Sequence, residues 1–430
     1  MQYCKELTSH HPPLHTLLLI YVISFASRFG DINSGIAVFV IAQMIFAASV
    51  FSFTLHKMHQ WKVLPFWRYL ALLWFAFFPT VCMFVLCTTK DTLFSLFTLL
   101  FVVQLTDTMK SPKARLVQWI NVGILAFIML LLRNNAIYAF ILFLPFFLLT
   151  NAKHRKKGGI TFGAVIVSVL LVTNIVYPKI MSIPKGSLKE MLCVPTQQLA
   201  RVYHLNPQSI TAEERQKLVG LINENCLKLY DPQWADLIKN GIRLEFIKKD
   251  PSGFLELWLK LGLRNPKIYL DSFLLNTVQG WFPNAVMDGY NSPPSPPTLY
   301  PYDGTSYFEF NVESPGKWEQ DMPNNPLTHF YYNISKSSTI NRLPILGLLF
   351  SPSALLAMLV FCVLFAFKKT QVTRSALFAP LLYVLLLCTT VFLGPIMLPR
   401  YFLILFFIFP LMVAFIGNYR KFLQGRSTPC

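Results

Sequence analysis

Long apolar runs separated by short polar connections make up most of this chain. A helix that crosses a bilayer needs roughly 17–25 apolar residues, and nine runs approach or reach that length. The pattern therefore predicts an all-α polytopic membrane protein with about nine transmembrane helices. The nine expected spans are residues 35–55, 66–87, 92–107, 117–132, 136–150, 159–178, 342–367, 374–394 and 399–417.

The region between residues 179 and 340 has a different pattern. Thr211-Ala-Glu-Glu214 has the form of a helix-capping box and leads into apolar residues at helical spacing. Residues 235–262 continue as an amphipathic helix, with a break expected at Pro251. Residues 291–301 contain five prolines and favour an irregular chain. We therefore expect a mostly helical and irregular extramembrane segment.

Acidic residues follow the same division. Sixteen of the 20 acids lie between residues 179 and 340, and only Glu6, Asp31, Asp91 and Asp107 lie elsewhere. The same region holds 16 of the 38 basic residues, so the formal charge of +18 belongs to the flanks. Because ionised groups are costly in a bilayer, each acid in the flanks needs a reason.

Composition supports the membrane class. Charged residues make up 13% of the chain and hydrophobic residues 54%, whereas soluble domains carry about 25% charged residues. The positive charge is dispersed in short groups between apolar runs and forms no single basic patch, so we expect a bilayer and no nucleic acid as partner.

Basic residues also predict the orientation, because cytoplasmic loops are rich in Lys and Arg. Fifteen of them fall in one alternating set of loops and five in the other: Lys5, Arg28, Lys90, Arg133 and Arg400. This count predicts a cytoplasmic C-terminus and an extracytoplasmic segment 179–340. It leaves open whether the short apolar run 14–26 spans the membrane or lies on its surface.

These boundaries divide the chain into five parts. We expect a first extracytoplasmic loop with a surface helix (1–34), six spans (35–178), the extracytoplasmic segment (179–340), three spans (341–418) and a cytoplasmic tail (419–430).

The predicted outer face is where chemistry is expected. Its candidate substrate-binding residues are Lys90, Arg133, Asn134, Arg400, Tyr401, His10 and His11. An isolated Arg at a helix end commonly snorkels to the interface. Three basic residues on the side that positive charge avoids favour binding of a lipid phosphate, whose oxygens suit the guanidinium group.

Asp91 is the candidate catalytic residue, because it is the membrane-flank acid next to this basic group. It either caps the helix that begins there or lines a polar pocket, and the two roles are compatible. Asp31 and Asp107 are expected to be structural. The chain has no phosphate-binding glycine loop, nucleophile elbow, zinc site or Asp-x-Asp motif. We therefore assign no cofactor, and a divalent metal stays open, as does a disulfide between Cys193 and Cys226.

Several motifs resemble those of GT-C superfamily glycosyltransferases, membrane enzymes that use polyprenyl-phosphate sugars. His10-His-Pro-Pro-Leu-His15 is similar to an element of their first outer loop, and Thr89-Lys-Asp-Thr-Leu-Phe-Ser95 to their Asp-containing second outer loop. Leu132-Arg-Asn-Asn-Ala-Ile-Tyr138 and Leu398-Pro-Arg-Tyr401 resemble their Arg-Asn-Gly-Tyr turn and the Arg-Tyr of a late span. Pro195-Thr-Gln-Gln-Leu-Ala-Arg201 is similar to a stretch of a bacterial branch.

The resemblance implies a GT-C-like bundle with the N-terminus outside and residues 14–26 as a surface helix. It also implies an inverting transfer from a lipid-linked sugar donor to a glycan or lipid-anchored acceptor at a bacterial plasma membrane. Arg133 and Arg400 would hold the donor phosphate with help from Lys90, and a carboxylate would act as general base.

The chain departs from that superfamily at its start. The expected first span and its acid, upstream of His10, are missing from this sequence, where only Glu6 precedes the motif. We expect a shortened and inactive version, or one that uses Asp91 or Glu6 instead. Two other functions stay open: a transporter or flippase of a lipid-linked saccharide, and a polysaccharide polymerase or ligase.

Overall fold

The computed structural model describes residues 11–30, 32–111, 113–283, 345–368 and 374–417, together with residue 326. Every regular element in these residues is helical, and extended residues pair only at one antiparallel bridge between Ile222 and Ile242. The chain forms two compact units. One comprises Met1–Lys185, Val286–Cys388 and Pro399–Cys430, and the other Gly186–Ala285 with Thr389–Leu398.

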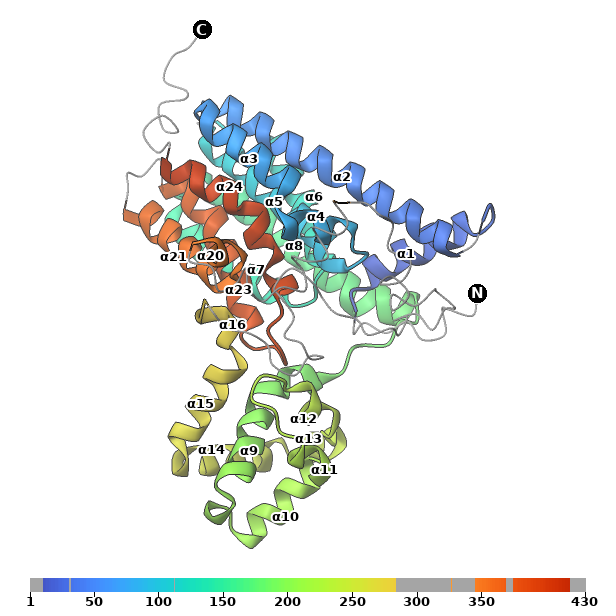
Figure 1. Ribbon diagram of the computed structural model, residues 1–430, viewed down its shortest axis with the longest axis vertical. Coiled ribbons are helices and arrows are strands. Elements are labelled where there is room, and N and C mark those ends of the chain that lie inside the picture. The colour runs from blue at the N-terminus through green and yellow to red at the C-terminus, as the bar shows by residue number, and fades with distance from the viewer. Residues whose placement is uncertain are drawn as a thin grey trace. The chain divides into compact units, whose positions relative to one another are not determined.

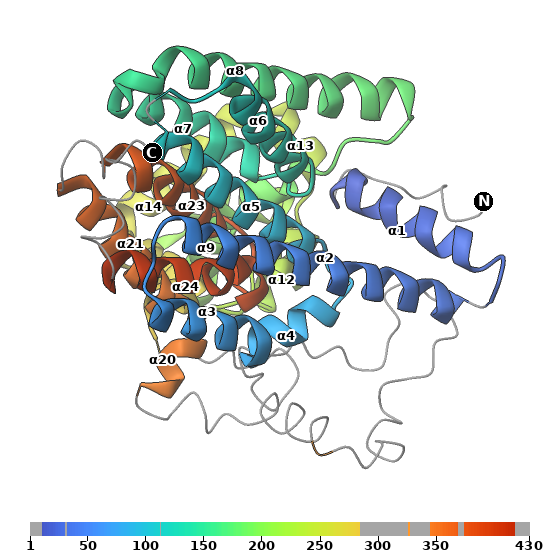
Figure 2. The ribbon, with the colours of Figure 1, turned by 90° about the horizontal axis from the view of Figure 1, so that it is seen from above.

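The first unit contains the apolar helices (Figures 1 and 2). They are α1 (Pro13–Ala26), α2 (Ile32–Gln60), α3 (Pro65–Phe77), α4 (Pro79–Leu86), α5 (Lys90–Lys110), α6 (Leu116–Leu131), α7 (Ala136–Thr150), η2 (Ala152–His154), α8 (Arg155–Leu171), η3 (Val172–Ile180), α20 (Leu346–Phe350), α21 (Pro352–Lys368), η7 (Arg374–Phe378), α23 (Ala379–Val391), η8 (Pro399–Phe402) and α24 (Leu403–Gly417).

Four described helical stretches are long and apolar enough to cross a membrane: Ser34–Gln60, Lys90–Lys110, Ala152–Ile180 and Pro399–Gly417. The bent pair α3–α4 makes a fifth if it is counted as one span. The other four expected spans coincide with helices of 10–17 residues. The predicted positions of the helices are therefore confirmed, whereas the number of nine spans is not.

Proline explains the bend between α3 and α4. Pro79 is the first residue of α4 and has no N–H to continue the ladder of α3. Phe78 before it takes an extended conformation, with a ψ of 121°. The two helices consequently diverge by 47°, so that one predicted apolar run becomes two helices.

Helix α5 is the most buried helix of the first unit (Figure 2), and α2, α6, α24 and η7 pack around it. Its neighbours include an aromatic cluster in which ring edges meet ring faces, an arrangement that the ring quadrupoles favour. The cluster consists of Phe101, Phe140, Phe143, Phe162 and Tyr383, all fully buried. This packing fixes the helix on which Asp91 lies.

The second unit is a separate helical core. Its elements are η4 (Leu188–Leu192), α9 (Cys193–Leu205), η5 (Pro207–Ser209), α10 (Ala212–Leu221), α11 (Glu224–Lys228), α12 (Asp236–Asn240), α13 (Leu244–Lys249), α14 (Pro251–Arg264), α15 (Pro266–Asn276) and α16 (Val278–Trp281). Apolar side chains of α9, α10, α14 and the short helices between them form its interior.

The local predictions for this unit are largely confirmed. Thr211 and Glu214 form the expected capping box, and a helix begins at Pro251. Residues 235–262 form three helices: the break before Pro251 is the expected one, and a further break at Gly241 was not predicted. Cys193 and Cys226 are both free thiols. Glu6, His10, Asp31 and the proline-rich residues 291–301 lie outside the described residues.

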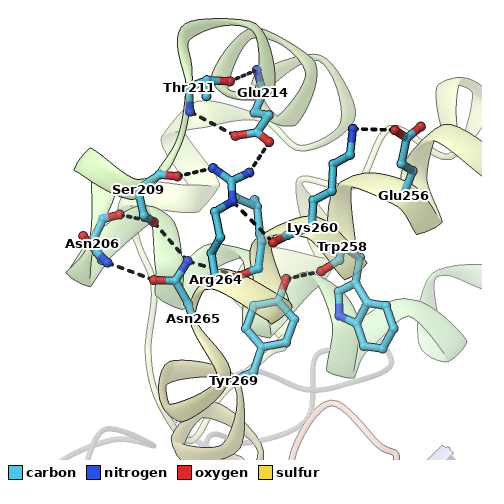
Figure 3. A network of polar contacts seen from close by, with 11 residues as sticks. Asn206, Ser209, Thr211, Glu214, Glu256, Trp258, Lys260, Arg264, Asn265 and Tyr269 are labelled. Carbon is cyan, nitrogen blue, oxygen red and sulfur yellow. Dashed lines mark hydrogen bonds and ion pairs between the residues drawn. The ribbon is translucent and has the colours of Figure 1, made fainter.

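A network of polar side chains joins the helices of the second unit (Figure 3). The guanidinium of Arg264, at the end of α14, donates to the Glu214 carboxylate and, at 2.7 Å, to the Ser209 carbonyl. Asn265 donates to Ser209 Oγ at 3.0 Å and accepts from Asn206 at 2.9 Å. These bonds tie the ends of α9, α10 and α14 together.

Candidate functional site

Asp91 lies in the first turn of α5, directly after its first residue, Lys90. The N-cap position belongs to Thr89, and Asp91 is not the capping residue. Only 2% of its side chain is exposed, and its Oδ1 atom has no hydrogen-bond partner among the described residues. The start of a helix still favours a carboxylate electrostatically.

Two arginines face this carboxylate from other elements. Arg133 Nη1 lies 3.7 Å from Asp91 Oδ1, and Arg400 Nε lies 4.0 Å from Oδ2. Arg133 belongs to the turn between α6 and α7, and Arg400 to η8 before α24. The structure thus brings together three residues that are far apart in the sequence. The side chain of Arg133 is 8% exposed and that of Arg400 is 22% exposed.

Arg133 is held in place by several contacts. Its Nε donates to Asn135 Oδ1 at 3.0 Å and its Nη1 to the Tyr401 carbonyl at 3.1 Å. The guanidinium also lies 5.2 Å from the centre of the Phe94 ring and 5.5 Å from that of Tyr401. At these distances the guanidinium makes favourable cation–π interactions with both rings. Arg133 is therefore preorganised, with its charge directed towards Asp91.

Tyr401 contacts both arginines. Its hydroxyl accepts a hydrogen bond from Arg400 Nη2 at 3.2 Å, and its ring lies 5.0 Å from the Arg400 guanidinium. Among the predicted binding residues, Asn134 is exposed and it is Asn135 that contacts Arg133. His11 lies just before α1, and Lys90 precedes Asp91 on α5.

Among the described residues, two guanidiniums lie against the Asp91 carboxylate at ion-pair distances beyond ordinary hydrogen-bond length. Lys90, the residue adjacent to Asp91, is a third basic residue at the same end of α5. Guanidinium groups are well suited to the oxygens of an anion such as phosphate.

Gln43 of α2 supports the turn before α5, a role that no sequence pattern indicates. Its amide donates to the carbonyls of Val85 and Cys87 at 2.7 and 2.8 Å. The Thr92 hydroxyl donates to the Phe84 carbonyl at 2.6 Å. These bonds satisfy the carbonyls that the end of α4 leaves unpaired, and they fix the position at which α5 begins.

His15 of α1 is a second buried polar residue that sequence reasoning did not include among the site residues. It is 7% exposed, and its ring meets the Phe39 ring edge-on with centroids 6.1 Å apart. The groups that act on its charge are Asp91, Lys90 and the Thr88 backbone. His15 therefore belongs with Lys90 and Asp91 at this end of α5.

No cluster of three or more His, Cys, Asp or Glu side chains suited to a metal ion occurs in the described part of the chain.

A family model, described as a family of unknown function (DUF6020), matches residues 3–414. The chain belongs to the DUF6020 family. The match includes Asp91, Arg133 and Arg400, so the whole charged cluster lies inside the region that defines DUF6020. No curated protein and no solved structure matches the chain.

An apolar groove of about 660 Å³ lies in the same unit, between α3, α4, α20 and α24. Aromatic residues dominate its walls: Trp67, Trp74, Phe77, Phe78, Phe350 and Phe409. The polar Nε1 of Trp74 donates a hydrogen bond to the Phe406 carbonyl at 2.8 Å. The groove therefore presents hydrocarbon and ring surface to any occupant.

Proposed function

We propose that this protein is a membrane glycosyltransferase that transfers a sugar from a polyprenyl-phosphate donor to a glycan or lipid-anchored acceptor. The observation that carries the proposal is the pair of arginines, buried Arg133 and half-buried Arg400, against the buried Asp91 carboxylate at the start of an apolar helix. Arginine forks match phosphate oxygens, and a neighbouring carboxylate can accept a proton from an attacking hydroxyl.

Each residue of the cluster has a role in this reaction. Arg133 and Arg400, assisted by Lys90, bind the donor phosphate, and Tyr401 orients both guanidiniums. An acceptor hydroxyl forms a bond to the anomeric carbon, while the bond from that carbon to the phosphate oxygen breaks and its electron pair leaves with the lipid phosphate. Asp91 takes the hydroxyl proton, and direct displacement inverts the anomeric centre.

The apolar groove supports a lipid-linked donor. Helical rise is about 1.5 Å per residue, so Pro410 in the groove wall lies roughly 15 Å along η8 and α24 from Arg400. A polyprenyl chain bound by its phosphate at Arg400 can reach the groove. The positive-inside count supports a site on the extracytoplasmic face of the plasma membrane, with the C-terminus in the cytoplasm.

The direct test is sugar transfer in proteoliposomes that contain the full chain and a radiolabelled polyprenyl-phosphate sugar. Asp91→Asn, Arg133→Lys and Arg400→Lys should each lower the transfer rate at least about 100-fold, close to 2.7 kcal/mol of transition-state stabilisation. Asp91→Asn should retain donor binding, whereas the two Arg→Lys variants should weaken it because Lys lacks the planar fork. Normal transfer by all three variants, with unchanged melting temperatures, would refute the proposal.

The bend between α3 and α4 favours a second candidate, a transporter of a lipid-linked saccharide. Broken membrane helices are frequent at transporter binding sites. A transporter moves the labelled lipid between leaflets without consuming it, whereas the proposed enzyme releases polyprenyl phosphate. Measuring both products in the same vesicles separates the two functions.

A further inference from the structure

Two buried hydrogen-bonding atoms beside the start of α5 have no hydrogen-bond partner among the residues that the structure describes. They are Nε2 of His15 and Oδ1 of Asp91. Buried polar atoms in proteins are nearly always paired with protein, water or ligand, and each exception calls for an explanation. Because both atoms belong to one charged cluster, an absent ligand group is a physical explanation for the two together.

The surroundings of His15 bear on whether its Nε2 is a hydrogen-bond donor or acceptor. The contact between the imidazole and the Thr88 backbone acts to raise the pKa of His15. A backbone carbonyl that accepts from a ring N–H has this effect. We assign the proton of the neutral ring to Nδ1, on the side of the Thr88 backbone, so that Nε2, which has no partner among the described residues, is an acceptor.

The ring is neutral at physiological pH. Burial lowers the pKa of His15 to about 4, with Lys90 acting in the same direction and Asp91 and the Thr88 backbone opposing it. Asp91 Oδ1 is likewise an acceptor. The cluster therefore has a side that offers two acceptors, His15 and Asp91, besides the side on which Arg133 and Arg400 offer donors.

Tight helix packing fixes His15 in this position. Helix α1 runs beside α2 (Figure 2), and a Cβ on Gly35 of α2 would lie 2.9 Å from Ile23 Cα of α1. Only glycine allows this approach. The edge-on contact with Phe39 then restrains the imidazole itself. His15 is therefore held rigidly at the site, as a binding residue must be.

We propose that His15 binds the acceptor substrate: its Nε2 accepts a hydrogen bond from a hydroxyl neighbouring the one that Asp91 deprotonates. The inference rests on the proposed function and deepens it. Two acceptor atoms require two donors from one ligand, so the acceptor is a saccharide with neighbouring hydroxyls. His15 gains no proton in the reaction and orients the sugar for attack on the anomeric carbon.

Three variants test this role by separating donor from acceptor. His15→Phe keeps an aromatic ring but removes the accepting nitrogen, and His15→Gln restores an accepting atom. The full chain in proteoliposomes should show a donor Kd within twofold of wild type for both variants. The acceptor KM should rise at least tenfold for His15→Phe and recover to within about threefold for His15→Gln. His56→Phe, an exposed residue of α2, should leave both constants unchanged. An unchanged acceptor KM in His15→Phe would overturn the inference, and so would an equal loss of donor binding.

A readout independent of transfer distinguishes failure of this inference from failure of the proposed function. In protein labelled with ¹⁵N-histidine, the resonance absent from His15→Gln should be that of a neutral ring protonated on Nδ1. Its Nε2 shift should respond saturably to at least one of a panel of methyl pyranosides. A response of the Nε2 shift without any sugar transfer would refute the proposed transferase activity but support saccharide binding at His15. A charged ring, or no response to any pyranoside, would overturn the role of His15.

Discussion

Single residues differ in this protein mainly through the partners that the fold gives them. Helix α5 carries two acids, Asp91 in its first turn and Asp107 near its last. Asp107 accepts hydrogen bonds from Lys57 Nζ at 2.9 Å and Trp61 Nε1 at 3.0 Å, so both of its oxygens are satisfied. Asp91 Oδ1 has an arginine at ion-pair distance and no hydrogen bond among the described residues. Asp107 therefore stabilises the fold, whereas Asp91 is the acid to which we assign the chemistry.

Replacement of each acid by Asn tests that difference with one chemical change at two positions. Asp107→Asn should lower the free energy of unfolding by about 1.5–3 kcal/mol, the usual size of hydrogen bonds to a charged group, and leave sugar transfer intact. Asp91→Asn should lower stability less and abolish transfer. Thermal unfolding in detergent and the transfer assay measure the two effects. The opposite pattern would show that Asp91 is the structural acid.

Site residues were predictable where a residue type was rare in its surroundings. Asp91, Arg133 and Arg400 are charged residues at the ends of apolar runs on the same predicted side of the membrane, and this combination made them candidates. Gln43 is an uncharged residue inside the long helix α2, and no local pattern reveals that it reaches the carbonyls after α4. The choice between Asn134 and Asn135 could not be predicted for a similar reason, because the conformation of the turn decides which amide faces Arg133.

At the scale of elements, glycine determines how closely α6, α7 and α8 approach. A Cβ on Gly158 of α8 would lie 2.4 Å from Phe147 Cε1 and 3.0 Å from Trp119 Cη2. Gly163, five residues later in the same helix, has open space around it. The two positions therefore have opposite requirements although their residue type and helix are the same.

Gly158→Ala should destabilise the first unit, since the buried rings of Phe147 and Trp119 must move and overpacking typically costs about 1–3 kcal/mol. Gly163→Ala should be neutral or stabilising by up to about 1 kcal/mol, because Ala is the better helix former. Melting temperatures of the two variants provide the comparison. Equal melting temperatures would show that the crossing tolerates a methyl group.

Helix α10 is tied to α14 through Glu214, and this connection has a pH dependence. Burial disfavours the charged carboxylate, but bonds from the Thr211 backbone and Arg264 outweigh it, so the pKa of Glu214 lies below its ordinary value of 4.5. A carboxyl group with a lowered pKa in the folded state adds stability above its unfolded pKa, and this stability is lost as pH falls through the folded pKa.

Glu214→Gln should therefore lower the melting temperature of the second unit at pH 7, and the difference from wild type should shrink as pH falls below 4.5. Glu256→Gln is a suitable control, because Glu256 pairs with Lys260 on an exposed face where solvent screens the interaction (Figure 3). We expect little change in melting temperature for the control, both at pH 7 and below pH 4.5. A constant difference for Glu214→Gln across this range would contradict the assignment.

Apolar periodicity predicted where helices lie but not how long each is. Backbone breaks at Pro79 and Pro352 divide two of the predicted spans, and whether a proline bends a helix or begins a new one depends on the conformation of the residue before it. The capping box at Thr211 was predictable because all of its determinants lie within four residues.

At the scale of the whole molecule, the second unit overlaps the acid-rich region. It includes Gly186–Ala285 of the predicted extramembrane segment 179–340, whereas the residues from Val286 belong to the first unit. The second unit also includes Thr389–Leu398, which the sequence assigned partly to a span. That segment is held through backbone carbonyls: Pro395 accepts from Ala235 N at 2.8 Å, and Gly394 from Asn276 at 3.3 Å. Such bonds leave no signature in side-chain hydropathy.

The charge distribution predicts which side of the membrane each part of the chain faces. If the positive-inside rule governs this chain, the basic group that includes Lys156 faces the cytoplasm, and Lys249 of the second unit faces outward. Both side chains are exposed. In a variant whose eight cysteines are replaced by alanine, Lys249→Cys should react with a membrane-impermeant maleimide in intact cells. Lys156→Cys should react only after permeabilisation. The reverse result would place the Asp91 cluster on the cytoplasmic face, where an extracytoplasmic glycosyl transfer could not occur.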